Sequence, residues 1–280
     1  MLVCEPDRVK STREDRLKIS LRESAFRRSP AELTLEKSFA ELARMGYDGV
    51  ELSTNPDREA RGVRQRRGVW PGTLDQARRA QLKAAAAANG LEIPTLSSDW
   101  AWGYADFHPT LGGWGRGTEL LVDDAKLAAD VGAGSILIHF GTSTGTWDQA
   151  KGILKEAAGE SERLGVVLGF EGSIWFRVGL GGQETLVRMV DEIASPALKI
   201  YVHPHGDTAA QVRDIEQVGD RICALHASAL NPDVDYGQVF AALKRAGYDW
   251  YWCFEVAEDL FAASASGFKE LARKPRVSLQ

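Results

Sequence analysis

Histidine and glutamate side chains end several apolar runs of this sequence, and these residues are the most suited to chemistry. His139 ends SILIH, Glu171 ends VVLGFE, His203 ends LKIYVH, His226 ends ICALH and Glu255 ends WYWCFE. The chain has only 5 histidines, so three of them in such places form a pattern that asks for an explanation. Imidazole and carboxylate groups act as general acids and bases, and they also bind divalent cations such as Mn, Fe, Co, Ni and Zn.

A carboxylate that follows an apolar run is partly desolvated, so without a partner it is protonated or destabilising. A divalent cation removes that cost. Neighbouring strands lie about 4.8 Å apart, so ligands that end successive strands can converge on one ion. The predicted metal ligands, one from each of four successive strand ends, are Glu171, His203, His226 and Glu255. His205 is an alternative to His203, because the two histidines flank Pro204.

Each of these residues also has an ordinary structural interpretation. A single histidine at a strand end is more often a hydrogen-bonded structural residue, and a glutamate there is structural about as often as functional. The joint pattern over successive strand ends favours a shared metal site.

Short β-branched runs alternate with amphipathic stretches and must position these residues. The predicted strands are Leu17–Leu21, Gly49–Ser53, Glu92–Leu96, Ser135–His139, Val166–Glu171, Leu198–His203, Ile222–His226 and Trp250–Glu255. The predicted helices cover residues 30–45, 73–88, 118–131, 147–164, 183–194, 208–218, 236–246 and 259–273. Eight such units predict an α/β fold, a single (β/α)8 TIM barrel whose catalytic groups lie at the carboxyl ends of the strands. We expect the barrel to span residues 17–273, between polar tails at 1–16 and 274–280.

The composition excludes several classes of protein. The 280 residues carry a net charge of −5, which argues against a nucleic-acid backbone as the main partner. The 3 cysteines do not form a disulfide framework, and no apolar stretch reaches the ~18 residues of a membrane span. The charged start MLVCEPDRVKSTREDR is unlike a secretory signal. We therefore expect a soluble cytoplasmic protein with a small-molecule partner.

Longer motifs surround three of the strand ends, namely LGFEG at Glu171, RICALHAS at His226 and GYDWYWCFE at Glu255. With GYDGVEL at 46–52 and DYGQVFAALKRAGYD at 235–249, they make the chain resemble the sugar phosphate isomerase/epimerase family of xylose isomerase-like barrels. The resemblance covers about residues 17–273. The superfamily that it indicates includes isomerases, epimerases, dehydratases and endonuclease IV.

The resemblance implies a metal site of Glu, Asp, His and Glu on strands five to eight. Glu171, His226 and Glu255 match by residue type, whereas His203 stands at the aspartate position. Two carboxylates and two neutral histidines sum to −2, so one divalent ion neutralises the site. A neutral site is the stronger Lewis acid and favours Zn, Fe or Co over Mg. The implied cofactor is one divalent ion, Mn, Zn, Fe or Co.

Other departures from the family narrow the substrate. Gly206 replaces the second histidine of ketose epimerases, and Pro232 replaces an arginine that follows the strand-seven histidine. Ser228-Ala229 replaces the Lys-Asp pair of dehydratase-like members. These departures do not support the usual set of residues that bind a phosphosugar or a free ketohexose. His139 resembles a strand-four ligand of endonuclease IV, but the further zinc ligands of that enzyme are missing.

Aromatic residues follow predicted strands three and five. Trp100 and Trp102 lie in DWAWGY, and Trp175 and Arg177 lie in IWFR. Flat apolar faces in such loops suit a sugar ring or an aromatic aglycone, and they equally suit packing of the loops onto the barrel. Arg177 either steers an anionic substrate or is solvated.

The predicted site suits removal of a proton beside a carbonyl, with an enediolate stabilised by the ion. In the family the glutamates of strands five and eight often face each other across the substrate. The resemblance therefore implies Glu171 and Glu255 as the acid–base pair, with His139 or His205 as an auxiliary acid.

The sequence alone is compatible with three functions. The first is a metal-dependent isomerase or epimerase of a polyhydroxy carbonyl compound, a sugar or a cyclitol. The second is a lyase or dehydratase that acts on a keto-glycoside or keto-inositol. The third is a non-catalytic partner subunit. Barrels of this family are often dimers or tetramers, so a homo-oligomer agrees with the resemblance.

Overall fold

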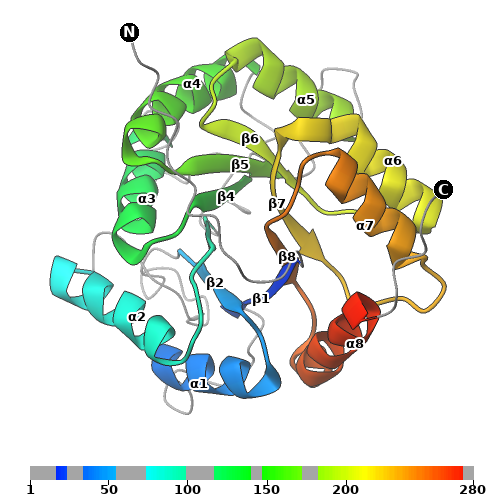
Figure 1. Ribbon diagram of the computed structural model, residues 1–280. Helices are drawn as coiled ribbons and strands as arrows, with labels where there is room; N and C mark the ends of the chain where they lie inside the picture. The colour runs from blue at the N-terminus through cyan, green and yellow to red at the C-terminus, as the bar shows by residue number, and fades with distance from the viewer. Residues whose placement is uncertain are drawn as a thin grey trace, which may run out of the picture.

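The computed structural model describes residues 17–23, 34–54, 74–98, 117–139, 147–171 and 182–273. It contains a closed barrel of eight parallel strands in sequential order, and β8 pairs with β1. The helices surround the barrel (Figure 1). The predicted (β/α)8 TIM barrel is confirmed, while the predicted tails 1–16 and 274–280 lie outside the described residues.

The bounds of the elements follow the predicted alternation closely. The strands are β1 (Lys18–Arg22), β2 (Gly49–Ser53), β3 (Thr95–Ser97), β4 (Ser135–His139), β5 (Val167–Glu171), β6 (Leu198–Val202), β7 (Ile222–Ala227) and β8 (Tyr251–Phe254). The helices are α1 (Leu35–Met45), α2 (Gln76–Ala88), α3 (Gly117–Val131), α4 (Trp147–Leu164), α5 (Gly182–Ile193), α6 (Thr208–Val218), α7 (Tyr236–Arg245) and α8 (Phe261–Arg273).

Helix α1 begins at Leu35, after the N-cap Thr34, rather than at residue 30 as predicted. Among the strands, β3 differs most from its prediction. It begins at Thr95 rather than at Glu92, and Glu92 makes only an isolated bridge to Gly49. Pro94 has no N–H to donate to the sheet, so regular pairing starts after it.

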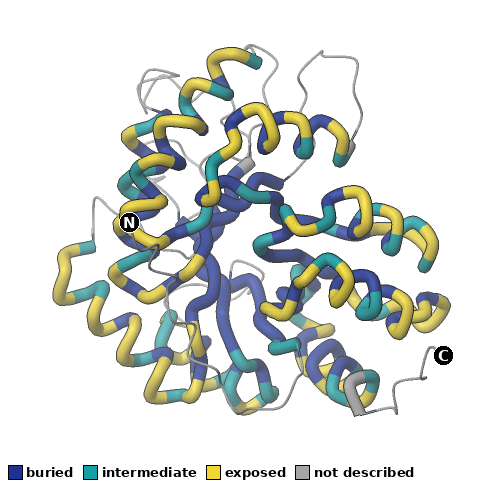
Figure 2. The backbone as a smooth tube through the Cα atoms, turned by 45° about the horizontal axis from the view of Figure 1, so that its top comes forward, coloured by how far each residue is buried: buried dark blue, intermediate teal, exposed yellow. Residues whose placement is uncertain are grey.

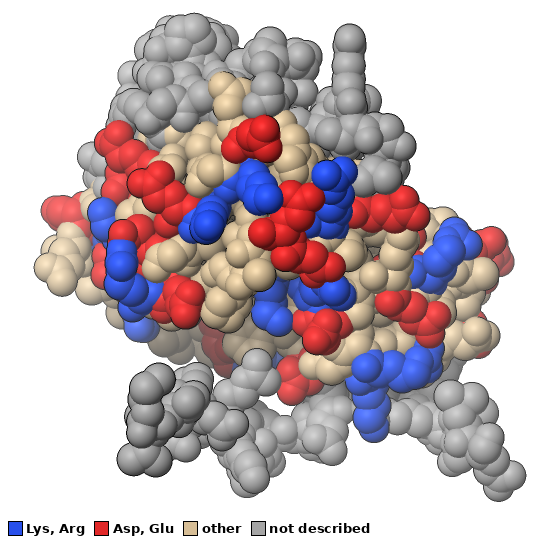
Figure 3. Space-filling view, turned by 90° about the horizontal axis from the view of Figure 1, so that it is seen from above, with Lys and Arg blue, Asp and Glu red and all other residues tan. Residues whose placement is uncertain are grey.

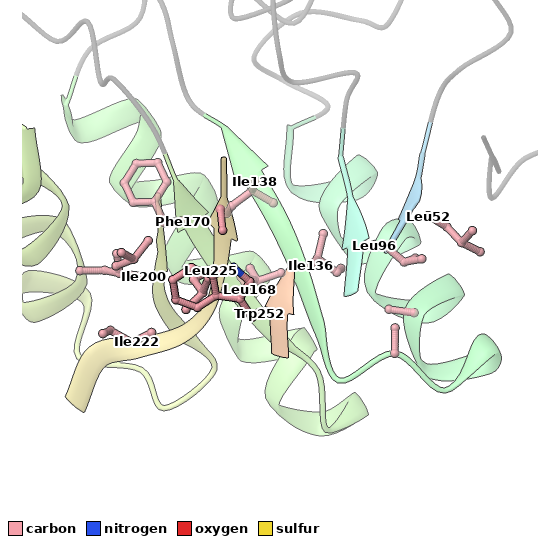
Figure 4. Packing of buried hydrophobic residues seen from close by; sticks show 14 of the residues in the cluster. Leu52, Leu96, Ile136, Ile138, Leu168, Phe170, Ile200, Ile222, Leu225 and Trp252 are labelled. Carbon is pink, nitrogen blue, oxygen red and sulfur yellow. The ribbon is translucent and has the colours of Figure 1, made fainter. Parts of the chain in front are cut away.

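The outward faces of the strands build the main hydrophobic core against the helices. Residues of this core that Figure 4 labels are Leu52, Leu96, Ile136, Ile138, Leu168, Phe170, Ile200, Ile222, Leu225 and Trp252. Most strand residues are buried, and many of the exposed residues lie on the outer faces of the helices (Figure 2). On helix α1, for example, Phe39 and Leu42 are buried one turn apart, in the pattern of an amphipathic helix.

The inward faces of the strands are different, because they carry polar side chains at alternate positions. One small apolar cluster, Leu137, Tyr201 and Ala224, packs against Cys223 inside the barrel. Gly169 leaves room for this cluster because it has no side chain; a Cβ at that position would lie only 2.9 Å from the Sγ atom of Cys223. The interior of the barrel therefore combines this apolar cluster with buried polar groups.

On the face shown in Figure 3, acidic and basic side chains are interspersed. Among the described helices, none combines the length and the apolar character that crossing a membrane requires.

Candidate metal centre and active site

The ends of β5, β6 and β7 bring three potential ligands together. The Oε1 atom of Glu171 lies 3.4 Å from the Nδ1 atom of His203 and 3.4 Å from the Nδ1 atom of His226. One donor atom from each residue lies within 4.8 Å of the others, which is close enough for one cation to contact all three.

Glu255 lies just beyond β8, beside this group rather than within it. Its Oε2 atom is 3.6 Å from the Nδ1 atom of His226. The side chain of Glu255 is 37% exposed and that of His203 is 22% exposed, whereas His226 is fully buried. The cluster therefore has a closed inner side at His226 and an open outer side at Glu255 and His203.

The short connection between β6 and α6 positions two histidines differently. Gly206 adopts a positive φ of 86°, and the Asp207 side chain caps α6 by accepting a hydrogen bond from the Ala210 N–H. His205 is exposed, and its ring lies 4.0 Å from the ring of His203, centre to centre. The partial burial of its ring, followed by the charge of His203, lowers the pKa of His205. Of the two histidines that the sequence leaves open, His203 is the one beside Glu171.

Arg22 at the end of β1 is a charged residue of this site that the sequence analysis missed. Its guanidinium forms an ion pair with Glu255 and donates a hydrogen bond of 3.2 Å to the Ser97 hydroxyl. Burial raises the pKa of Glu255, but the charges of Arg22 and His226 outweigh this effect and leave the pKa lowered. Glu255 is therefore ionised at neutral pH.

Glu51 on β2 is a second residue that was missed as part of the site. Its Oε1 atom lies 2.9 Å from the Nε2 atom of His226, and its Oε2 atom accepts a hydrogen bond of 2.6 Å from the Tyr201 hydroxyl. Burial alone lowers the pKa of His226, but the charges of Glu51 and Glu171 outweigh it and raise the pKa well above its ordinary value.

A signal for both missed residues was present in the sequence. The strands KISLR and GVELS place polar side chains at alternate positions, with Arg22 and Glu51 among them. A strand of a closed barrel is buried on both faces, so polar residues with a period of two indicate an interior lined by polar groups.

The other predicted site residues cannot be placed by their side chains. The backbone of His139 ends β4 and pairs in register with Glu171, but its side chain is not among those described. Trp100, Trp102, Trp175 and Arg177 lie outside the described residues.

The donor set fits a divalent cation. Among the described residues, the Nδ1 atom of His226 and the Nε2 atom of His203 are buried without a hydrogen-bond partner. When the histidines bind an ion as neutral imidazoles, the carboxylates of Glu51, Glu171 and Glu255 and the guanidinium of Arg22 sum to −2. Mixed imidazole and carboxylate ligands suit Zn, Fe, Co or Mn, and one divalent charge balances the cluster.

The family of the chain follows from a comparison of sequences. A model of the xylose isomerase-like TIM barrel family matches residues 39–273, so the chain belongs to this family, as its motifs indicated. No curated protein matches the sequence of the chain.

Solved structures of sugar epimerases have the same fold. L-ribulose 3-epimerase superposes with a TM-score of 0.67 at 18% identity, over 91% of this chain and 94% of the other. D-allulose 3-epimerase from Methylomonas sp., in complex with D-allulose, gives 0.64 at 17% identity, over 91% and 97%. The apo form of 3-keto-D-glucoside 4-epimerase from E. coli gives 0.64 at 17% identity, over 92% and 99%. At these identities the similarity shows the fold alone.

Proposed function

We propose that the protein is a divalent-metal-dependent isomerase or epimerase that acts on a polyhydroxy carbonyl compound, a sugar or a cyclitol. The observation that carries the proposal is the convergence of Glu171, His203 and His226 at the carboxyl end of the barrel, with Glu255 beside them. Active sites of TIM-barrel enzymes lie at this end. The sugar epimerases of the same fold support the substrate class.

Four side chains would hold the ion, namely Glu171, His203, His226 and Glu255. When bound, a divalent ion polarises the substrate carbonyl and makes the neighbouring C–H more acidic. Glu171, His203 and His226 already lie within reach of one ion. Glu255 completes the set from the open side, where its Oε1 atom stays paired with Arg22.

The proton steps fall to the two glutamates. Glu255 is held ionised by Arg22 and is partly exposed, so it is able to accept a proton from a substrate carbon on the open side. Glu171, on the neighbouring side of His226, delivers to the other face or to the adjacent carbon a proton that it receives from an auxiliary acid, and Glu255 then releases its own proton to solvent. His205 or His139 serves as the auxiliary acid, and Trp100, Trp102, Trp175 and Arg177 bind substrate.

A cavity lies at the connections that follow β6 and β7, and none of the four proposed ligands lines it. It measures about 280 Å³ and its lining includes His205, Gly206, Ser228 and Asn231. This volume lies just below the usual range of small-molecule sites, about 300–1,000 Å³.

The first test is the metal content of the purified protein, measured by elemental analysis. The wild type is expected to bind one equivalent of Zn, Fe, Co or Mn, and His203→Ala or His226→Ala to lose it. His205→Ala is the matched control, since His205 is exposed and stacks on His203 from outside the cluster. A wild-type protein that binds none of these ions after reconstitution contradicts the proposal.

The second test is proton exchange with solvent. The metal-loaded protein is incubated in deuterium oxide with free ketoses, 3-keto-glycosides and keto-inositols, and the products are followed by NMR and mass spectrometry. Deuterium is expected beside the carbonyl of one substrate, together with its epimer or isomer, and not with Glu171→Gln. Release of an aglycone or water identifies a lyase instead. A metal-loaded protein that exchanges no proton in any of these compounds argues for a binding subunit.

A further inference from the structure

Glu51 occupies a central place in the barrel interior, where it contacts side chains from four other strands. It is fully buried, and its partners are Arg22 on β1, Tyr201 on β6, His226 on β7 and Cys253 on β8. Strand β2 neighbours none of β6, β7 and β8 in the sheet, so these contacts cross the interior. Arg22 extends from here to Glu255 on the open side, but Glu51 itself is fully buried and so is not placed to touch a substrate.

The two ring nitrogens of His226 face different groups. The Nε2 atom lies 2.9 Å from Glu51, whereas the Nδ1 atom faces Glu171 at 3.4 Å and Glu255 at 3.6 Å. An ionised carboxylate only accepts hydrogen bonds, so the Nε2 atom carries a proton and donates it to Glu51. In the neutral ring the Nδ1 atom then keeps its lone pair, directed at the cluster of ligands.

Glu51 is itself held in place. The Tyr201 hydroxyl donates to its Oε2 atom at 2.6 Å, and the Nε atom of Arg22 lies 3.7 Å from its Oε1 atom. Glu51, His226 and Cys253 could also form a small metal site of their own. The Tyr201 hydroxyl already uses one oxygen of Glu51, and all three residues of this second group are buried, away from the open side. The open cluster around Glu171 is the better cation site.

We infer that Glu51 is a positioning residue for the metal site: it accepts a hydrogen bond from the Nε2–H group of His226 and thereby directs the Nδ1 lone pair toward the ion. The inference rests on the proposed function as regards the ion, but the hydrogen bond to His226 exists without it. Replacing a carboxylate that accepts a hydrogen bond from a metal-bound histidine typically weakens metal binding about 10–100-fold.

The first measurement is Zn²⁺ and Co²⁺ affinity, by competition with a chromophoric chelator. Glu51→Met removes the acceptor and is expected to weaken binding about 10–100-fold, while Glu51→Gln keeps an acceptor oxygen and falls between Glu51→Met and the wild type. Glu92→Gln is the matched control, because Glu92 also accepts a tyrosine hydrogen bond but lies at the other end of the barrel. Folded Glu51 variants with wild-type affinity overturn the inference and leave the proposed function standing.

The second measurement needs no metal. In ¹⁵N-labelled, metal-free protein, the Nε2 proton of His226 is expected to exchange slowly with solvent, and loss of its signal in His226→Asn assigns it. The signal should disappear or shift in Glu51→Met, or shift in Glu51→Gln if Glu51→Met does not fold. A neutral wild-type ring that is protonated on Nδ1 alone, or an Nε2 signal indifferent to Glu51, overturns the inference. A wild type that shows this bond but binds no metal contradicts the proposed function instead.

Discussion

The same pair of groups, a tyrosine hydroxyl and a glutamate, occurs at two places in this barrel. Tyr201 donates to Glu51 at 2.6 Å in the buried interior, where Glu51 is fully enclosed. Tyr251 donates to Glu92 at 2.9 Å near the amino ends of the strands, where the Glu92 side chain is 56% exposed and also pairs with Lys18. The chemistry is the same, and only the access of water differs.

The difference shows how the barrel maintains a charged interior. Water screens Glu92, so its partners are expected to contribute little to stability. Glu51 has no water to solvate it, so Tyr201, Arg22 and His226 must supply its hydrogen bonds and its counter-charge. The interior partners of Glu51 are therefore costly to lose, and one of them is a predicted metal ligand.

The largest effect is expected from Arg22→Met. This variant removes the guanidinium that pairs with Glu255 and lies near Glu51, and it leaves buried negative charge uncompensated. We expect the free energy of unfolding to fall by about 3–5 kcal/mol in urea denaturation of the metal-free protein. Lys18→Met, which breaks an exposed pair, should cost less than about 1 kcal/mol. Equal losses in the two variants would remove the distinction between the two ends of the barrel.

The two tyrosines give a direct comparison. Tyr201→Phe leaves a buried carboxylate oxygen without its donor and should lower the free energy of unfolding by about 2–3 kcal/mol. Tyr251→Phe leaves an oxygen that water can reach, so the loss should stay below about 1 kcal/mol. Both are measured by chemical denaturation under the same conditions. A larger loss for Tyr251→Phe would show that access of water does not separate the two pairs.

Packing under Tyr201 offers a further test. A Cβ added at Gly169 would lie 2.9 Å from the Cys223 Sγ atom and 3.2 Å from Cδ2 of Tyr201. Gly169→Ala should therefore displace Tyr201 and destabilise the fold by about 1–3 kcal/mol. Adding Cys223→Ala should restore part of the loss, since the sulfur is the nearest obstacle. Full stability of Gly169→Ala would show that the interior is looser than these contacts indicate.

Both tyrosines should make the free energy of unfolding depend on pH in the alkaline range, by about 1.4 kcal/mol per pH unit for each tyrosine. Burial, with the charge of Glu51 or Glu92 next, raises the pKa of Tyr201 and of Tyr251. Above about pH 10 the unfolded chain releases these protons and the folded chain does not, so stability falls as pH rises. The free energy of unfolding, measured by chemical denaturation between pH 8 and 11, should fall less steeply with pH for Tyr251→Phe than for the wild type. Identical slopes would contradict the raised pKa of Tyr251.

Much of the fold could be predicted because its signals are local. Strands β2 and β4 have their predicted bounds, and Glu171 ends β5 as expected. The alternation of apolar runs with amphipathic helices is a property of neighbouring residues, and it suffices for a parallel barrel. The start of β3 was wrong because one proline removes a backbone donor and the apolar pattern does not register this.

The sequence by itself determined the barrel, its family motifs and the set of strand-end residues from which the metal site is proposed. Only the tertiary structure decided that His203 rather than His205 lies beside Glu171, that Arg22 pairs with Glu255, and that Glu51 contacts the inner nitrogen of His226. The last two pairs join strands distant in sequence, and β2 and β7 are not even adjacent in the sheet. They meet only when the barrel closes and directs alternate side chains into one interior without water.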